Sequence, residues 1–102
     1  MKAQFIYDKE TDSLAVFTGR RTRASVELGS ELIVDLGVKN DVTGVEFINS
    51  GKLLKLSKKA LQGMSRASLA SVIRGGVTWI CVSLTVVGLE KEIRIPLTMA
   101  GR

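Results

Sequence analysis

The sequence predicts one α+β domain over residues 1–102, a mainly antiparallel β-sheet of seven to eight short strands with one short amphipathic helical segment near residues 51–63. A chain of 102 residues is long enough for one modest core, since a domain of this size buries about 60–70% of its unfolded surface. Only five residues are aromatic, and the many Val, Leu and Ile favour a β-rich interior. A strand-rich first half, a basic helical segment and a second strand-rich stretch follow one another.

The first two strands form a hairpin. Residues 3–7 and 13–17 are short β-type runs on either side of residues 8–12. The Asp residues between these runs favour a turn, so we expect a hairpin with a loop of several residues. A polar loop at residues 19–23 follows.

Three more strands complete the first half, at residues 25–28, 32–36 and 42–48. Gly29 and Ser30 separate the first two of them. Residues 37–41 are expected to form a turn, because Asn40 and Asp41 tolerate left-handed backbone geometry.

Read from Phe5 to Ser50, this order of short strands, acidic turn and Gly44-Val45-Glu46 strand resembles a family of small bacterial and archaeal proteins, domain-of-unknown-function family 2283. The resemblance covers the first half well and the second half loosely. It implies a β-rich fold and brings no established activity. It also implies an antitoxin-like association with small toxin-like proteins, without a mechanism for particular residues.

After Gly51 the apolar period becomes helical. The apolar positions are Leu53, Leu56, Ala60, Leu61 and Met64. The opposite face carries Lys52, Lys55, Lys59 and Gln62. Ser50 is a candidate N-cap, Ser57 is an alternative cap of a second short helix, and Gly63 ends the segment.

Residues 67–74 are ambiguous between helix and strand. We interpret them as a strand, because Gly75 and Gly76 then form a tight hairpin turn into residues 77–86. A turn at Val87 and Gly88 leads to a final strand at residues 89–97. Pro96 lacks a backbone donor, so this strand ends there or lies at an edge of the sheet.

The strand at residues 77–86 has two different faces. The first is a core stripe of Ile80, Val82, Leu84 and Val86. The second carries Val77, Trp79 and Cys81 and needs a cover. Burial inside the domain is the favoured interpretation. The alternative is a protein interface formed by Val77, Trp79 and Cys81, since Trp is a favoured interface anchor.

The composition argues against several kinds of catalytic and metal-binding site. The chain has no histidine and one cysteine, Cys81, which excludes histidine-based catalytic pairs, histidine metal sites and disulfide frameworks within the chain. We therefore expect no enzyme activity, no cofactor and no metal. The lone cysteine favours a cytoplasmic location. The sequence contains no run of about 18 apolar residues, so we expect no membrane-spanning segment.

Two groups of acidic residues are candidate sites. Asp8, Glu10 and Asp12 alternate as calcium ligands can, but the positions where a calcium-binding EF-hand loop needs Gly and Glu are Ser13 and Gly19. A solvated turn is the favoured interpretation. Strand residues Glu27, Asp35 and Glu46 are more simply explained as solvent-facing than as catalytic carboxylates.

The formal net charge is +5, which favours acidic partners. The candidate nucleic-acid contacts are Arg20, Arg21, Arg23, Lys52, Lys55, Lys58 and Lys59. They would act together if the fold brings the arginine loop and the helical segment into one patch. A solvated basic face is the favoured alternative.

The function predicted from these observations is that of a small interaction module. We expect the chain to form a homodimer or homo-oligomer, or to bind a small protein partner. We expect no association with a membrane. The alternative is a nucleic-acid-binding accessory protein that uses the basic surface.

Overall fold

The structure is a computed structural model that describes residues 2–86 and 88–97. These residues form eight strands and two short helices, in the order β1 (Lys2–Asp8), β2 (Ser13–Phe17), β3 (Ala24–Glu27), β4 (Leu32–Leu36), β5 (Val42–Phe47), α1 (Ser50–Leu54), α2 (Lys58–Gln62), β6 (Met64–Arg74), β7 (Val77–Val86) and β8 (Leu89–Leu97). The five strands expected in the first half are confirmed to within one or two residues at each end.

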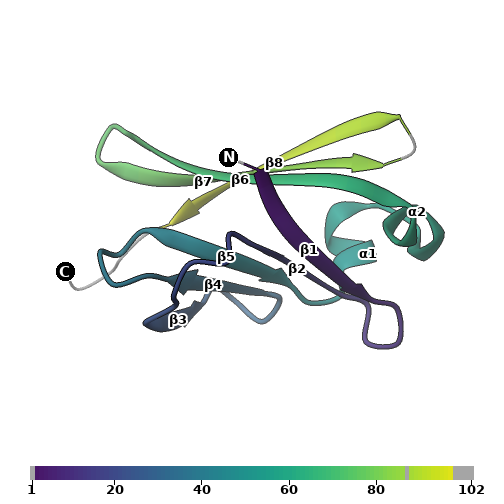
Figure 1. The fold of residues 1–102 in the computed structure, drawn as a ribbon, viewed down its shortest axis with the longest axis horizontal. Coiled ribbons are helices and arrows are strands. Elements are labelled where there is room, and N and C mark those ends of the chain that lie inside the picture. The colour runs from purple at the N-terminus through teal and green to yellow at the C-terminus, as the bar shows by residue number, and fades with distance from the viewer. Residues whose placement is uncertain (1, 87, 98–102) are drawn as a thin grey trace.

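The eight strands belong to one antiparallel sheet with the order β3-β4-β5-β2-β1-β6-β7-β8. β1 is shared between two parts of this sheet: residues 4–8 pair with β2, while Lys2 and Ala3 pair with Ser68 and Ala67 of β6. The sheet bends over at β1, so that β6–β8 lie across from β1–β5 in a half-barrel (Figure 1).

The core lies between these two parts of the sheet. Each strand alternates inward apolar residues with outward ones, as expected of a sheet with one solvated face. The fully buried inward side chains include Leu14, Val16, Val34, Val45, Phe47, Ile80, Val82 and Leu84. The predicted core stripe on β7 is therefore confirmed.

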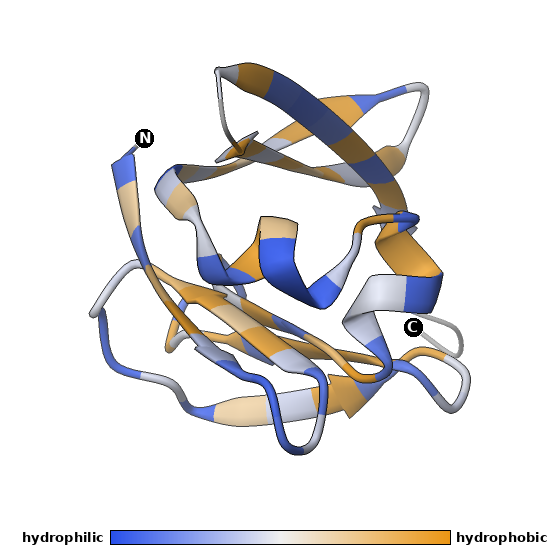
Figure 2. Cartoon of the chain, turned by 90° about the vertical axis from the view of Figure 1, so that its right-hand side faces the viewer, coloured by the Kyte–Doolittle hydropathy of each residue, from blue (hydrophilic) through white to orange (hydrophobic). Residues whose placement is uncertain are grey.

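The two helices lie between the parts of the sheet at one end of the molecule (Figure 2). Leu54 of α1 and Leu61 of α2 are buried in the core. Lys55 has a left-handed backbone (φ 57°) and ends α1. Ser57 caps α2 by accepting a 3.0 Å hydrogen bond from the backbone N–H of Ala60. The alternative of a second short helix capped by Ser57 is thus confirmed, and Gly63 ends it as expected.

Two details of the helical prediction were wrong. The N-cap of α1 is Asn49, and Ser50 is the buried first residue of the helix. Leu54 takes the core position, and Leu53 is 41% exposed. Because α1 is a single turn that ends at Lys55, a helical period continued across it is out of phase with the next helix.

The prediction for residues 67–74 is confirmed, although β6 begins earlier, at Met64. Gly75 and Gly76 form the two-residue turn to β7, with φ of 58° and 78°. β8, with Pro96, is an edge strand. The expected turn at Val87 and Gly88 falls partly outside the described residues, which do not include Val87. With five residues in each helix, the fold is mainly β, with less helix than the expected α+β class implies.

Candidate functional site

The strongest candidate site is the outer face of the three-stranded part of the sheet, which we call the hairpin face. It is defined by Val72 and Arg74 of β6, Trp79 and Cys81 of β7, and Glu92 and Arg94 of β8. Antiparallel pairing brings these residues together, since Trp79 lies opposite Val72 on one side and Pro96 on the other. Cys81 in turn lies opposite Arg94.

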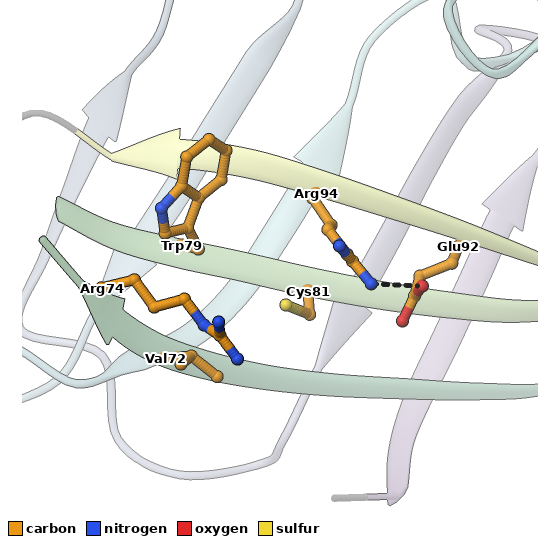
Figure 3. A pocket seen from close by; sticks show the side chains of 6 residues that line it. All are labelled: Val72, Arg74, Trp79, Cys81, Glu92 and Arg94. Carbon is orange, nitrogen blue, oxygen red and sulfur yellow. Dashed lines mark hydrogen bonds and ion pairs between the residues drawn. The ribbon is translucent and has the colours of Figure 1, made fainter.

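The hairpin face contains a shallow groove of about 480 Å³ lined by these six residues (Figure 3). Trp79, Cys81 and Val72 provide its apolar surface. Arg94 donates to Glu92 at 3.2 Å, and both side chains are more than half exposed. An apolar centre with charges of both signs beside it is the usual composition of a protein interface.

No helix or strand of the described chain covers the hairpin face, because both helices lie against the inner face. Val77, Trp79 and Cys81 are partly exposed, and Val72 is 42% exposed. The favoured expectation that this second face of β7 is buried inside the domain is therefore not what the structure shows. The alternative, a face left for a partner, stays open.

The β6–β7 hairpin turns at one end of the molecule (Figure 1). Ile73 lies near the tip of this hairpin, on the opposite face from Val72, and is 75% exposed. The tip therefore presents apolar side chains on both faces, and surface of this kind marks interaction sites more often than chance.

The arginine loop is tied to the turn between β4 and β5. Arg20 forms an ion pair with Asp41 at 3.3 Å. The Arg23 side chain donates to the backbone oxygen of Gly37 and to the side chain of Asn40. Two of the three predicted arginines thus have partners within the chain.

The helical lysines lie at the other end of the molecule. Lys52, Lys55, Lys58 and Lys59 are exposed on α1, α2 and the bend between them. The arginine loop is beside the first residues of β5 and the helices follow its last residue, and six strand residues span roughly 17 Å. The structure does not bring the two basic groups into one patch.

Acidic and basic residues are unevenly distributed. From Ser50 to Val86 the chain has no Asp or Glu, but it carries six Lys and Arg: Lys52, Lys55, Lys58, Lys59, Arg66 and Arg74. The helices and the long hairpin are therefore the positive part of the molecule.

Asp12 of the acidic turn has a structural role. Tyr7 donates a 2.6 Å hydrogen bond to Oδ1 of Asp12, and the backbone N–H of Gly51 donates to Oδ2 at 3.1 Å. Ser50 donates through its hydroxyl and its backbone N–H to the carbonyl oxygen of Asp12. Asp12 thus supplies, from 38 residues away, the acceptor for the first turn of α1 that Asn49 does not.

These contacts shift two pKa values. The hydrogen bond from Tyr7 is the main cause that lowers the pKa of Asp12, assisted by donation from Gly51 and Ser50. Burial and the adjacent Asp12 carboxylate raise the pKa of Tyr7 to about 12. The oxygens of Asp12 that a calcium ion would need are occupied by these donors, while Asp8 accepts from the backbone N–H of Glu10. No group of three potential metal ligands occurs in the described part of the chain.

The three strand carboxylates share one face, a relationship that the sequence did not establish. Glu27 and Glu46 both lie opposite Ile33, and Asp35 lies opposite Ser25, whose hydroxyl donates to it at 2.6 Å. This is the outer face of β3–β5, so the expectation that each faces solvent agrees with their position. Glu27 is exposed, and Asp35 and Glu46 are half-buried on this outer face.

Sequence reasoning found Trp79 and Cys81 but missed Val72, Arg74, Glu92 and Arg94, which line the same groove. The alternation of β8 placed Glu92 and Arg94 on one face, and the tight turn at Gly75 and Gly76 fixed which residue of β6 lies opposite Trp79. The register of the predicted hairpin could therefore have identified the other residues of this groove.

Neither helix within the described residues is long and apolar enough to cross a membrane. No protein-family model matches the chain, and no solved structure matches it. The resemblance of residues 5–50 to domain-of-unknown-function family 2283 therefore stays a prediction. The chain is similar to an uncharacterized protein of Methanocaldococcus jannaschii, with 26% identity over 95 residues that cover 91% of this chain and 81% of that protein.

Proposed function

We propose that the protein is a small interaction module that pairs with a second copy of itself through the hairpin face. The observation that carries this proposal is the position of Trp79, partly exposed beside Val72 on a strand face that no described element covers. A Trp side chain has about 150–250 Å² of surface to bury, and Trp is among the residues that contribute most to interfaces.

The dimensions of the face agree with an interface of small size. Strands of about ten residues at roughly 3.3 Å each, in three rows about 4.8 Å apart, give a face of roughly 33 by 14 Å. This is at the low end for specific protein–protein contacts, so we expect a reversible dimer. Docking on a small toxin-like partner, as the family resemblance implies, would use the same face, and the lone cysteine favours the cytoplasm as the place for it.

Trp79 is the only tryptophan of the chain, so its fluorescence tests the proposal directly. In a concentration series, sedimentation velocity should show a shift from monomer to dimer. Over the same range, the Trp79 emission should move to shorter wavelength and acrylamide should quench it less. A chain that stays monomeric, with Trp79 equally quenched at every concentration, overturns self-association through this face.

The charge distribution favours a second candidate, nucleic-acid binding by the helical lysines. Lys52, Lys55, Lys58 and Lys59 are exposed, and none forms an ion pair with a described residue. Phosphate contacts of this kind give affinity without sequence specificity. Trp79 fluorescence separates the two candidates, because the lysines lie on the helices and the hairpin face lies on the far side of β6–β8.

A further inference from the structure

The half-barrel has an unclosed seam, because the edge strands β3 and β8 do not pair with each other. Inward-facing residues near this seam are consequently only partly buried, among them Val26 of β3 and Ile93 and Ile95 of β8. A cleft of about 350 Å³ lies on the β8 side of this seam, between β8, α1 and residues of β4 and β5, and we call it the seam cleft. Its lining is Leu32, Phe47, Leu53, Leu54, Lys55, Lys91, Ile93 and Ile95.

The lining has a simple chemical character. Six of the eight residues are apolar, and the other two are Lys55 and Lys91. None of the described residues that line the cleft is acidic, and neither lysine forms an ion pair with a described residue. Glu31 precedes the cleft residue Leu32 in the sequence. Its carboxylate accepts a hydrogen bond from the side chain of Asn49.

Two residues of the cleft, Leu53 and Lys55, do not adopt the arrangement that is most favourable for the stability of the fold. Leu53 is 41% exposed at the cleft although Leu54, its neighbour, is buried. Lys55 has a positive φ of 57° at the end of α1, a position that glycine occupies with less strain. Leu53 and Lys55 thus add exposed apolar surface and a positive charge to the lining of the cleft.

From these observations we infer that the seam cleft binds a small amphiphilic anion, a carboxylate with an unbranched apolar chain. The chain would contact Phe47, Leu54 and Ile93, and the carboxylate would lie between Lys55 and Lys91. The volume is near the lower end of small-molecule sites, which are about 300–1,000 Å³, so a chain of medium length fits. This inference does not depend on the proposed dimer, because the cleft is on the inner side of β8 and the hairpin face is on its outer side.

The test uses the whole chain and two probes with the same alkyl chain and opposite charge, decanoate and decyltrimethylammonium, each below its micelle concentration. Amide chemical shifts in a two-dimensional NMR titration report where each binds. Decanoate should give saturable shifts centred on Leu53, Lys55 and Ile93. The cationic probe should bind about tenfold more weakly or worse, because it places like charges beside two lysines.

The matched variants are Lys55→Met and Lys91→Met, with Lys52→Met and Lys59→Met as controls of equal charge change outside the cleft. Loss of one partly exposed charge pair should weaken decanoate binding about two- to fivefold, while the controls leave it unchanged. Circular dichroism checks that each variant is folded. If Lys55→Met does not fold, Lys91→Met alone tests the contribution of the cleft lysines.

Three results overturn the inference: no saturable decanoate shift, equal affinity for both probes, or shifts confined to the hairpin face. If a second copy of the chain fills the cleft instead, decanoate fails to bind, and the amides of Leu53 and Ile93 are protected as protein concentration rises. Sedimentation of the same variants keeps the two proposals distinct, since changes in the cleft should not alter a dimer formed through Trp79.

Discussion

The hydroxyl of Tyr7 and the carboxylate of Asp12 are joined by a 2.6 Å hydrogen bond across the first hairpin. The same carboxylate accepts from the backbone N–H of Gly51 at the start of α1. One side chain therefore connects the first hairpin to the first helix. Stability should depend on Asp12 far more than on the other acids of the same turn.

We expect Asp12→Asn to lower the free energy of unfolding by about 1–3 kcal/mol, because it removes the charge from the three hydrogen bonds donated by Tyr7, Ser50 and Gly51 and turns an amide donor toward one of these donors. Urea unfolding at neutral pH measures this. Asp8→Asn is the matched control, since it makes the same charge change on an exposed side chain of the same hairpin, and it should stay within about 0.5 kcal/mol of the unchanged protein. Equal losses would contradict the role of Asp12.

The lowered pKa of Asp12 sets the acid side of the stability profile. The unfolded chain binds the proton more readily than the folded one, so the contribution of Asp12 is complete well above its ordinary pKa of 3.8. It is lost as pH falls from there through the lower pKa of the folded state. Urea midpoints measured across this range should converge for the unchanged protein and Asp12→Asn as the solution becomes more acid.

The raised pKa of Tyr7 acts at the other end of the pH scale. The folded state holds the phenol proton up to a pKa of about 12, whereas the unfolded chain releases it near 10.0. The contribution of Tyr7 is therefore complete below pH 10 and is lost as pH rises toward 12. Since Tyr7 is the only tyrosine, absorbance of the phenolate gives its titration directly. A midpoint near the ordinary value in the folded protein would refute the hydrogen bond to Asp12.

For the hairpin face, Trp79→Ala should weaken the dimer by at least about tenfold, as expected of an interface anchor, and leave the chain folded. Ile6→Ala is the control, because Ile6 is an equally apolar exposed residue on the outer face of β1. Sedimentation equilibrium gives the dissociation constants. If Trp79→Ala unfolds the chain, Val72→Glu tests the same face, and a Val72→Glu variant that still dimerises would place the interface elsewhere.

For the basic surface, replacing Lys52, Lys55, Lys58 and Lys59 by Gln should weaken binding to single-stranded and duplex nucleic acid. It should also reduce the slope of log affinity against log salt by about one for each phosphate that the protein no longer binds. Replacing Arg20, Arg21 and Arg23 by Gln is the comparison, and we expect a smaller effect because two of these arginines have partners within the chain. Fluorescence anisotropy over a salt series measures both. The reverse order of effects would assign the site to the arginine loop.

The local elements of this fold could be read from the sequence because each depends on neighbouring residues. The alternation of Ile80, Val82 and Leu84 predicted the buried face of β7, and the glycine pair at residues 75 and 76 predicted its turn. Within that hairpin the register also follows from the turn. The apolar surface around Trp79 was therefore accessible to sequence reasoning.

Long-range relationships could not be predicted. The position of β1 between β2 and β6 depends on how two parts of a sheet close over a shared core, and that pairing has no local signal. The link from Asp12 to Ser50 likewise joins residues 38 positions apart. Because such long-range relationships have no local signal, the sequence could not show whether the arginine loop and the helical lysines lie in one patch. They do not, because β2 and β5 run the full length between them.

The two-pair ladder between β1 and β6 has a consequence for folding during synthesis. Within the described residues, β1–β5 pair with one another without any help from β6–β8 except at Lys2 and Ala3. A ribosome adding about 5–20 residues per second needs roughly 2–10 s to extend the chain from Ser50 to Leu97. During those seconds the nascent first half presents Leu14, Val16 and Val45 to solvent. The apolar inner face of the first half is therefore most open to aggregation at the midpoint of synthesis, and slower elongation would lengthen that interval.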